Sequence, residues 1–448
     1  MNLKILNLFR IPDLRRKLMI TVGLLLVYRI GFHVPLPGVD VDALREAAER
    51  SGSLAALFGI MSSLTGGNLG SAALFSLGVM PYISASIIFS LLTKVMPSLE
   101  SLSKEGAAGQ RKINQYTRLA TIPICLFQSL FVIYGVLNSK TPGGNFLVPQ
   151  DIWGVPYILG TMVALTAGTF FIMWLGEQIT EHGLGNGISI IIMAGIIATI
   201  PKALVGFLGR GSLSADEKFQ TMLLYTLAWV LTVFVIVYIT KGQRRIPIQQ
   251  AKRTQGRKVY GGQRHFLPFK VNQAGVMPII FAAALMMLPN LLAQVPFLRF
   301  FSVFRDPSGW WYILIYSVFI IFFAFFWVQM MFQPKEIADN LREYGSFIPG
   351  IRPGKKTAEY LGYIMKRVTL AGSIFLCLIA VLPNIITKEI GNLQGTSFAY
   401  FLGGTSILIV VEVALDLVEQ INAQMVMKNY DGFMKGEATS RTGWGRNG

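Results

Sequence analysis

Residues 155–176 read VPYILGTMVALTAGTFFIMWLG, an apolar stretch without a charged side chain. A helix rises about 1.5 Å per residue, so about 20 such residues cross the hydrocarbon core of a membrane. With this stretch included, ten comparable runs cover close to half of the chain, at about 18–33, 72–93, 119–137, 155–176, 186–208, 220–240, 272–292, 310–331, 368–387 and 398–420. The sequence therefore predicts an all-α polytopic membrane protein with ten transmembrane helices.

The composition excludes most classes of soluble protein. Apolar residues make up 53% of the chain and charged residues 14%, with a mean hydropathy of +0.53, whereas about a quarter of the residues of a soluble protein are charged. Both cysteines, Cys125 and Cys377, lie in apolar runs, which excludes a disulfide scaffold. The three histidines are scattered along the chain, so we expect neither a metal site nor a cofactor.

The net charge of +17 is distributed unevenly between the loops. With ten spans both termini lie on the same side of the membrane, and the segments on that side hold 30 of the 40 Lys and Arg residues. Loops rich in Lys and Arg stay in the cytoplasm. We therefore predict a multi-pass protein of the cytoplasmic (inner) membrane with both termini in the cytoplasm.

One apolar segment, residues 54–65, is too short to cross a membrane and is followed by Gly66 and Gly67. Segments of this length are core or re-entrant pieces. The pattern leaves two interpretations open: a helix on the outer leaflet, or a short helix folded back into the bundle. The second is tolerated only where protein or a water-filled cavity surrounds the segment.

The spans divide into two halves of five, residues 1–210 and 211–420. If the halves are structurally related, an odd number of spans gives them opposite orientations in the membrane, as in proteins that open a path between two bundles. The remaining tail, residues 421–448, is rich in Gly and polar residues, and we expect it to be disordered.

The two long cytoplasmic loops, residues 241–270 and 332–367, differ in their chemistry. Residues 241–258 carry seven positive charges in eighteen residues and no acid. Such a stretch is either a solvated positive-inside loop or a docking surface for RNA phosphates or an acidic protein. In the second loop, Pro and Gly alternate around Arg352 over residues 347–357, which predicts a rigid turn with this arginine at its tip.

Two glycine-containing segments are similar to nucleotide-binding motifs but do not match them. Gly350 and Gly354 have three residues between them rather than the four of a P-loop, and the cluster at 183–187 lacks the dinucleotide-binding spacing. The sequence contains no nucleophile elbow, zinc motif or EF-hand. We therefore expect no catalytic residues, and an energy source that lies in a partner or a gradient.

Charged side chains are rare within the apolar runs. Glu412 is the clearest case, and Asp416 lies one turn further along the same run. Intramembrane carboxylates are functional candidates. Proton coupling, exposure to a wet vestibule and pairing with a neighbouring helix all remain open for these two residues.

Short strings spread over nearly the whole chain carry a family resemblance. They are Tyr28 to Gly31 with Pro35 to Gly38, Leu77 to Ile87, Met173 to Glu181 running into Gly185 to Ile190, Gly242 to Ile246, Val271 to Val276, Ile348 to Gly354 and Gly403 to Ser406. Together they resemble the bacterial SecY family, the channel subunit of the Sec protein translocase. The resemblance implies two inverted five-helix halves around a central hourglass pore that passes unfolded polypeptide.

The resemblance also assigns residues to three parts of such a channel. It implies an apolar ring at the waist of the pore, formed by Val79, Ile83, Ile192, Ile280 and Ile409. It implies that the segment 54–65 is a plug helix for the idle pore, with Leu54, Leu57, Phe58, Ile60, Met61 and Leu64. It implies a lateral gate between the second and seventh spans, where signal sequences leave into the lipid, with Ser86, Ile87, Asn272, Gln273 and, inside the seventh span, Pro278.

The partners that the resemblance implies are the small membrane subunits SecE and SecG, the motor ATPase SecA, the ribosome, membrane lipid, and an unfolded preprotein with its signal sequence. Arg244 and Arg245 are expected to face ribosomal RNA, and Arg352 the motor. The full set of expected docking residues is Arg244, Arg245, Lys252, Arg253, Arg257, Lys258, Arg352, Lys355 and Lys356.

Two other classes of protein share some of these features. A secondary transporter with inverted repeats has the same topology, but needs substrate or ion ligands near the midplane, where the sequence offers Glu412. A membrane-embedded enzyme needs a nucleophile, a metal set or paired acids at the lipid interface, and the sequence offers none. The channel is therefore the favoured interpretation.

Overall fold

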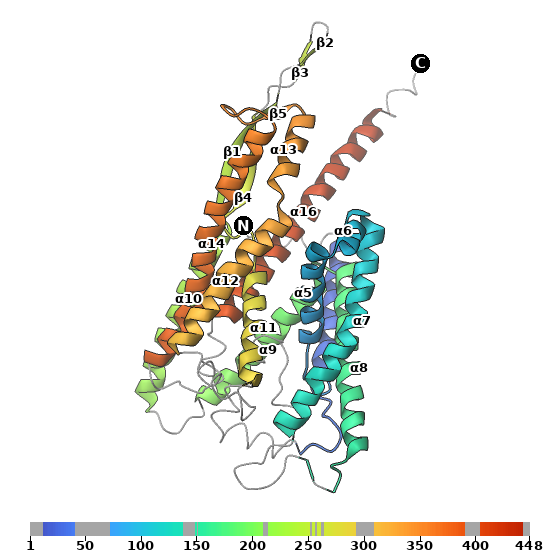
Figure 1. The fold of residues 1–448 in the computed structure, drawn as a ribbon, viewed down its shortest axis with the longest axis vertical. Coiled ribbons are helices and arrows are strands. Elements are labelled where there is room, and N and C mark those ends of the chain that lie inside the picture. The colour runs from blue at the N-terminus through green and yellow to red at the C-terminus, as the bar shows by residue number, and fades with distance from the viewer. Residues whose placement is uncertain are drawn as a thin grey trace. The chain divides into compact units, whose positions relative to one another are not determined.

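The computed structural model describes residues 12–40, 72–137, 148–149, 151–208, 214–250, 253–255, 258–260, 264–292, 309–389 and 404–441 (Figure 1). The segment 54–65, where a plug is predicted, lies outside these residues. Helices dominate the described part, and each of the ten apolar runs overlaps one. These helices are α2 (Pro12–Gly31), α5 (Met80–Val95), α7 (Ala107–Val132), α8 (Val155–His182), α9 (Gly187–Leu208), α10 (Ala215–Thr240), α11 (Met277–Leu292), α12 (Trp310–Met331), α14 (Lys355–Glu389) and α16 (Gly404–Arg441).

Three shorter helical elements complete this list. They are α6 (Pro97–Lys104), α13 (Pro334–Glu343) and the π-helical turn η2 (Ile133–Leu137). Within the described residues, four helical stretches are long and apolar enough to cross a membrane: Val155–His182, Lys218–Thr240, Trp310–Glu343 and Lys355–Leu382. The pair α5 and α6 adds a fifth if the two helices, bent by 99° at their junction, count as one span.

The apolar run 72–93 is helical only from Met80 onward. Residues 72–79 form turns in which Ala72 and Gly78 have positive φ angles of 40° and 58°. Backbone hydrogen bonds tie these turns to the end of α2, from Leu36 N–H to the Ala72 carbonyl (2.8 Å) and from Leu74 N–H to the Val34 carbonyl (2.9 Å). Apolar side chains are buried equally well in a turn or in a helix, provided that the backbone groups of the turn are hydrogen-bonded.

The tail differs from its expected disorder, because α16 continues through residues 421–441. This stretch contains no proline, and Ala, Met, Lys, Arg, Gln and Glu together make up ten of its 21 residues. These side chains lose little rotamer freedom in a helix, so the helix that leaves the apolar run is not interrupted.

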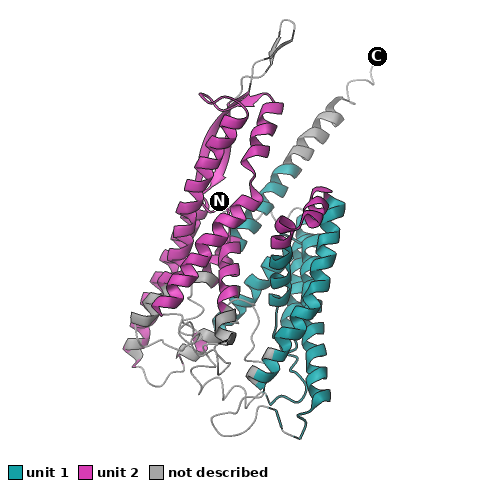
Figure 2. Cartoon of the chain, viewed as in Figure 1, with its two compact units in different colours: residues 1–89, 107–202, 413–448 teal, residues 90–106, 203–412 magenta. Residues whose placement is uncertain are grey.

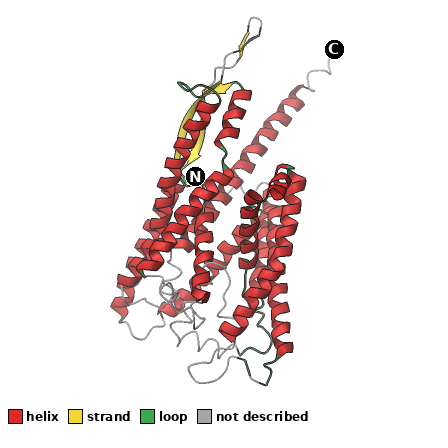
Figure 3. Ribbon diagram, viewed as in Figure 1, coloured by secondary structure: helices red, strands yellow, loops and turns green. Residues whose placement is uncertain are grey.

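The expectation of an all-α protein is wrong in the cytoplasmic loops, which contain an antiparallel sheet (Figure 3). Strand β1 (Gln243–Gln250) lies between β4 (Arg264–Lys270) and β5 (Ser346–Phe347), and β2 (Arg253–Gln255) pairs with β3 (Lys258–Tyr260). In β1, Ile246 and Ile248 are buried whereas Arg245 and Pro247 are exposed. This period of two indicates a half-buried strand.

The chain forms two compact units (Figure 2). Unit 1 contains residues 1–89, 107–202 and 413–448, and unit 2 contains residues 90–106 and 203–412. The main boundary lies close to the predicted division at residue 210. Two segments, 90–106 and 413–448, belong to the unit that contains most of the opposite half.

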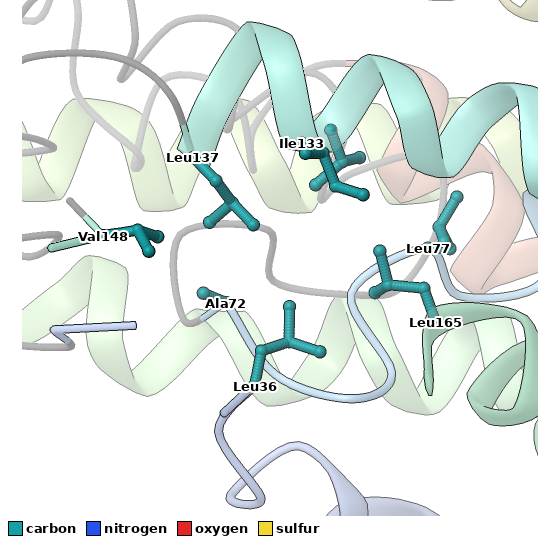
Figure 4. Close-up of a cluster of buried hydrophobic side chains, with 8 residues drawn as sticks. Leu36, Ala72, Leu77, Ile133, Leu137, Val148 and Leu165 are labelled. Carbon is teal, nitrogen blue, oxygen red and sulfur yellow. The ribbon is translucent and has the colours of Figure 1, made fainter. Parts of the chain in front are cut away.

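In unit 1, α8 packs against both α2 and α7. A buried aliphatic cluster lies beside these helices, with Leu36, Ala72, Leu77, Val132, Ile133, Leu137, Val148 and Leu165 (Figure 4). Phe75 fills the space next to it, because neither Gly31 of α2 nor Gly168 of α8 has a side chain there. A Cβ atom on Gly168 would meet the backbone carbonyl of Leu74.

In unit 2, α12 packs against α11 and α14, and α13 packs against α14. The buried cluster at the sheet end of these helices consists of Ile246, Phe269, Ala274, Val328, Ile348, Leu361, Ile364 and Met365. It combines residues from β1, β4, α12 and α14. This apolar cluster therefore anchors the two long loops to α12 and α14.

We predict that Gly168→Ala destabilises the chain, because the new methyl group overlaps the Leu74 carbonyl. Overpacking of this kind costs about 1–3 kcal/mol. The measurement is thermal unfolding of the purified protein in detergent. Gly160→Ala in the same helix is the matched control, since a Cβ there has no neighbour within 4 Å; equal unfolding midpoints for the two variants would contradict the packing argument.

Candidate functional site

The described residues of the basic loop 241–270 include two pairs of antiparallel strands. Strand β1 begins directly after α10, and its register pairs Arg244 with Phe269 and Arg245 with Pro268. Both arginines are exposed, while Ile246 and Phe269 point into the apolar cluster of unit 2. The buried side chains fix the backbone that presents the charges.

Strand β5 joins the second cytoplasmic loop to the first. Gln249 of β1 pairs with Phe347, and Gln250 with Ser346. The sequence indicates two separate loops, but in the structure they form one surface of unit 2. We call the exposed basic residues Arg244, Arg245, Arg352, Lys355 and Lys356 the basic surface.

The turn that holds Arg352 has the geometry expected from its Pro and Gly content. Gly350 and Gly354 have φ angles of 84° and 94°, values that side chains with a Cβ rarely adopt. Ile348 anchors the turn in the apolar cluster, and the buried Thr357 hydroxyl donates a hydrogen bond to the Arg352 carbonyl (2.9 Å). The backbone of Arg352 is thus held while its side chain is exposed.

Helix α14 begins with Lys355 and Lys356 and has no acid in its first turn. Positive charges are unfavourable at a helix N-terminus, by about 0.3–1 kcal/mol each at exposed positions. Lys356 forms an exposed ion pair with Glu359 (3.1 Å), and such pairs contribute little to stability. Helix stability therefore does not explain these lysines, and their docking role stays a prediction.

Two of the other expected docking residues lie in a second, shorter pair of strands. Arg253 and Lys258 lie in β2 and β3, which pair with each other. Lys252 and Arg257 lie outside the described residues.

The residues expected at the pore ring are apolar positions in both units. Unit 1 holds Val79, Ile83 and Ile192, and unit 2 holds Ile280 and Ile409. Val79 is the last residue before α5, and its carbonyl accepts a hydrogen bond from Ile83 N–H (3.0 Å). Val79, Ile192 and Ile409 are buried, and Ile83 and Ile280 are half-buried.

The residues expected at the lateral gate lie on α5 and around the start of α11. Ser86 and Ile87 are half-buried on α5. The apolar run 272–292 becomes helical only at Met277, so Pro278 lies in the first turn of α11 and not in the helix interior. Proline is tolerated in the first turn of a helix without a kink.

The two polar gate residues have partners of different kinds. The Gln273 Oε1 atom accepts a hydrogen bond from the backbone N–H of Lys270 (3.0 Å), a local contact within the turn. The buried Asn272 side chain donates from Nδ2 to Oε2 of Glu412 (3.5 Å). The sequence leaves open whether Glu412 pairs with a neighbouring helix. Its partner Asn272 lies 140 residues away in the chain, so local spacing does not reveal this contact.

A second interhelical contact was not anticipated from the sequence. Arg118 of α7 forms an ion pair of 2.6 Å with Glu177 of α8. Both residues lie near the cytoplasmic ends predicted for their spans. The spacing of charges within one helix does not show which charge on a neighbouring helix it will meet, so this pair was not predicted. Among the described residues, no three His, Cys, Asp or Glu side chains are grouped to hold a metal ion.

The fold defines a polytopic α-helical membrane protein with a small antiparallel sheet that carries exposed arginines. A family model described as SecY matches residues 73–418, and the chain belongs to the SecY family. It is 43% identical to the protein translocase subunit SecY of Streptomyces scabiei, over 95% of this chain and 98% of that protein.

Two solved structures share the fold at low sequence identity. One is titled as the structure of a protein conducting channel, with a TM-score of 0.61, 21% identity, and coverage of 92% of this chain and 93% of the other. The second is described as Sec61 in the canine ribosome-channel complex from the endoplasmic reticulum, with a TM-score of 0.59, 19% identity, and coverage of 92% and 93%.

We predict that Gly354→Ala loosens the turn that holds Arg352. A Cβ at this position meets no atom within 4 Å, so the positive φ is the source of strain, at about 1–2 kcal/mol. Hydrogen exchange of residues 348–354 should become faster. Gly362→Ala in α14 is the control, because its Cβ makes only an ordinary contact with Pro334; unchanged exchange in Gly354→Ala would show that the turn does not need glycine.

Proposed function

We propose that the chain is the channel subunit of a protein translocase, which passes unfolded secretory polypeptides across the membrane and releases apolar segments sideways into the lipid. The observation that carries this proposal is the 43% identity, over nearly the full length of both chains, to a protein named as a translocase subunit. The shared fold with a protein conducting channel supports it.

The channel consists of ten spans in two inverted five-helix halves around an hourglass pore. Val79, Ile83, Ile192, Ile280 and Ile409 form its waist, and the segment 54–65 closes it when idle. An apolar constriction excludes water and offers ions no ligand, but adapts to side chains of many shapes. The support from the structure is that these five positions are aliphatic and buried or half-buried.

The lateral gate opens between α5 and α11, where signal sequences reach the lipid. A buried CH₂ group is worth about 0.8 kcal/mol, so a signal segment of about ten apolar residues gains much by leaving the pore. A polar segment gains nothing and continues across the membrane. Selection therefore needs no chemistry beyond partitioning.

The basic surface binds the cytoplasmic partners that supply energy. Arg244 and Arg245 suit the phosphates of ribosomal RNA, and a structural neighbour is described as part of a ribosome-channel complex. Arg352 engages the motor ATPase SecA, because its planar guanidinium recognises carbonyl or carboxylate groups with several donors. SecE and SecG complete the membrane complex, which lies in the inner membrane with both termini of this chain in the cytoplasm.

A secondary transporter is the second candidate and is not favoured. A transporter binds its substrate with polar ligands near the midplane. Glu412 is the ligand that the sequence offers, and it is hydrogen-bonded to Asn272 of the same chain. Solute uptake by vesicles that contain this chain alone would favour the transporter.

Arg352→Glu is expected to lower motor-driven export by about tenfold or more, because a reversed charge repels the surface that the arginine binds. The measurement is ATP-dependent transport of a preprotein into vesicles. Lys335→Glu is the matched control: it makes the same change in charge at an exposed position of α13, where an acid suits the helix N-terminus. Normal export by Arg352→Glu would refute this role.

Replacing Ile83 and Ile280 together with Ser is expected to make resting vesicles leak ions, by about tenfold over the unmodified chain, because hydroxyl groups hydrate the waist. Leakage is followed by release of a trapped ion. Ile88→Ser serves as the control, since Ile88 lies on α5 with 46% of its surface exposed. Vesicles that stay as tight as with the Ile88 variant would count against the ring.

A further inference from the structure

Glu412 is a carboxylate within an apolar stretch of α16. Residues 406–411 before it and Val413 to Leu415 after it are uncharged, and the side chain of Glu412 is half-buried. A charged group at such a position is expensive unless it is paired. The proposed channel function gives Glu412 no role, so its contacts decide what it does.

Both carboxylate oxygens of Glu412 face the turn that precedes α11. Oε2 accepts the hydrogen bond from Asn272 Nδ2 (3.5 Å). Oε1 lies 2.9 Å from the position that a Cβ atom of residue 275 would occupy. Gly275 also has a φ angle of 65°, so this position accepts glycine for two independent reasons.

Asn272 depends strongly on this contact. Its side chain is 4% exposed, and among the described residues its Oδ1 atom has no hydrogen-bond partner. The amide is therefore oriented from its Nδ2 side, by Glu412. Without the carboxylate, the Asn272 Nδ2 atom loses this acceptor, and Oδ1 already has no partner. Unpaired polar atoms in a buried amide are unfavourable.

The rest of the turn packs against unit 2. Val271 N–H donates to the Gly242 carbonyl (2.9 Å), and Gly372 of α14 has no side chain where the Val271 carbonyl approaches. Ala274 belongs to the apolar cluster. Glu412 supplies the polar contact from α16, and it is the residue at which α16 passes from unit 2 to unit 1.

From these contacts we infer that Glu412 is a positioning residue, which ties α16 to the start of α11 and so sets how readily α11 moves. The inference rests on the proposed function, in which α11 is one side of the lateral gate. Movement of α11 then either breaks the contact with Asn272 or carries α16 along. A signal sequence has to overcome this resistance, so the contact sets the minimum hydrophobicity of a signal that opens the gate.

The first experiment tests the contact by thermal unfolding of the purified complex in detergent. The variants are Glu412→Val, Asn272→Val and the double variant. Each single change leaves one polar partner alone, whereas the double change removes both. We expect the double variant to be no less stable than either single variant; additive losses would overturn the contact.

The second experiment tests the gate with preproteins whose signal segment carries from about four to about twelve leucines in an alanine background. Transport into vesicles should show a threshold with the unmodified chain. With Glu412→Val, export of the weakest signals should rise by about fivefold. Glu412→Gln, which retains an acceptor of the same size, should keep the original threshold.

Asp416→Val is the matched control, because Asp416 lies one turn further on α16, is exposed and pairs with Gln420 (3.0 Å). Equal thresholds for Glu412→Val and Asp416→Val would overturn the inference, and so would a shift in Glu412→Gln as large as in Glu412→Val. If export by the unmodified chain did not depend on signal hydrophobicity, the proposed function would be overturned instead. The unfolding experiment would still test the contact between Glu412 and Asn272.

Discussion

Every backbone N–H and C=O group inside a bilayer needs a partner from the protein itself, and the rest of this structure depends on that constraint. A helix satisfies it within one segment, which is why each apolar run overlaps a helix. The turns at 72–79 and 271–276 are not helical; the residues of the first are buried except for the half-buried Leu74, and those of the second are buried or half-buried. Their backbone groups bond to neighbouring segments, at Leu36 and Val34 in one case and at Gly242 in the other.

Inside a membrane the hydrophobic effect does not drive helices together, because the surrounding lipid is as apolar as their side chains. Such helices associate through close packing and a few polar contacts. Gly168 and Gly372 provide the close contact, because each allows a backbone carbonyl to approach its helix. Arg118 with Glu177, and Asn272 with Glu412, provide polar contacts between segments far apart in the sequence. The second contact involves a residue expected at the lateral gate, which links a packing feature to the proposed mechanism.

The loop residues that form the sheet are under a different constraint, because charged side chains are tolerated where water is available. The apolar cluster around Ile246, Phe269 and Leu361 anchors a small sheet on the ends of α12 and α14. This anchoring fixes the positions of Arg245 and Arg352, whose side chains remain exposed. A flexible basic loop would attract the same anions but would lose more conformational entropy on binding.

Hydropathy alone determined the membrane class, the number of apolar runs and the basic character of the cytoplasmic loops, because these properties add along the chain. The turn around Arg352 was also predictable, since Pro349 fixes its own φ angle and Gly350 and Gly354 permit positive φ angles. The strand that contains Ile246 and Ile248 was not predicted, and its pairing with β4 and β5 depends on segments distant in the chain. Only the tertiary structure decided that β5 joins β1, that Pro278 lies in the first turn of α11, and that Glu412 meets Asn272. Contacts of this kind depend on how distant segments pack, and packing is a property of the whole chain that local patterns do not encode.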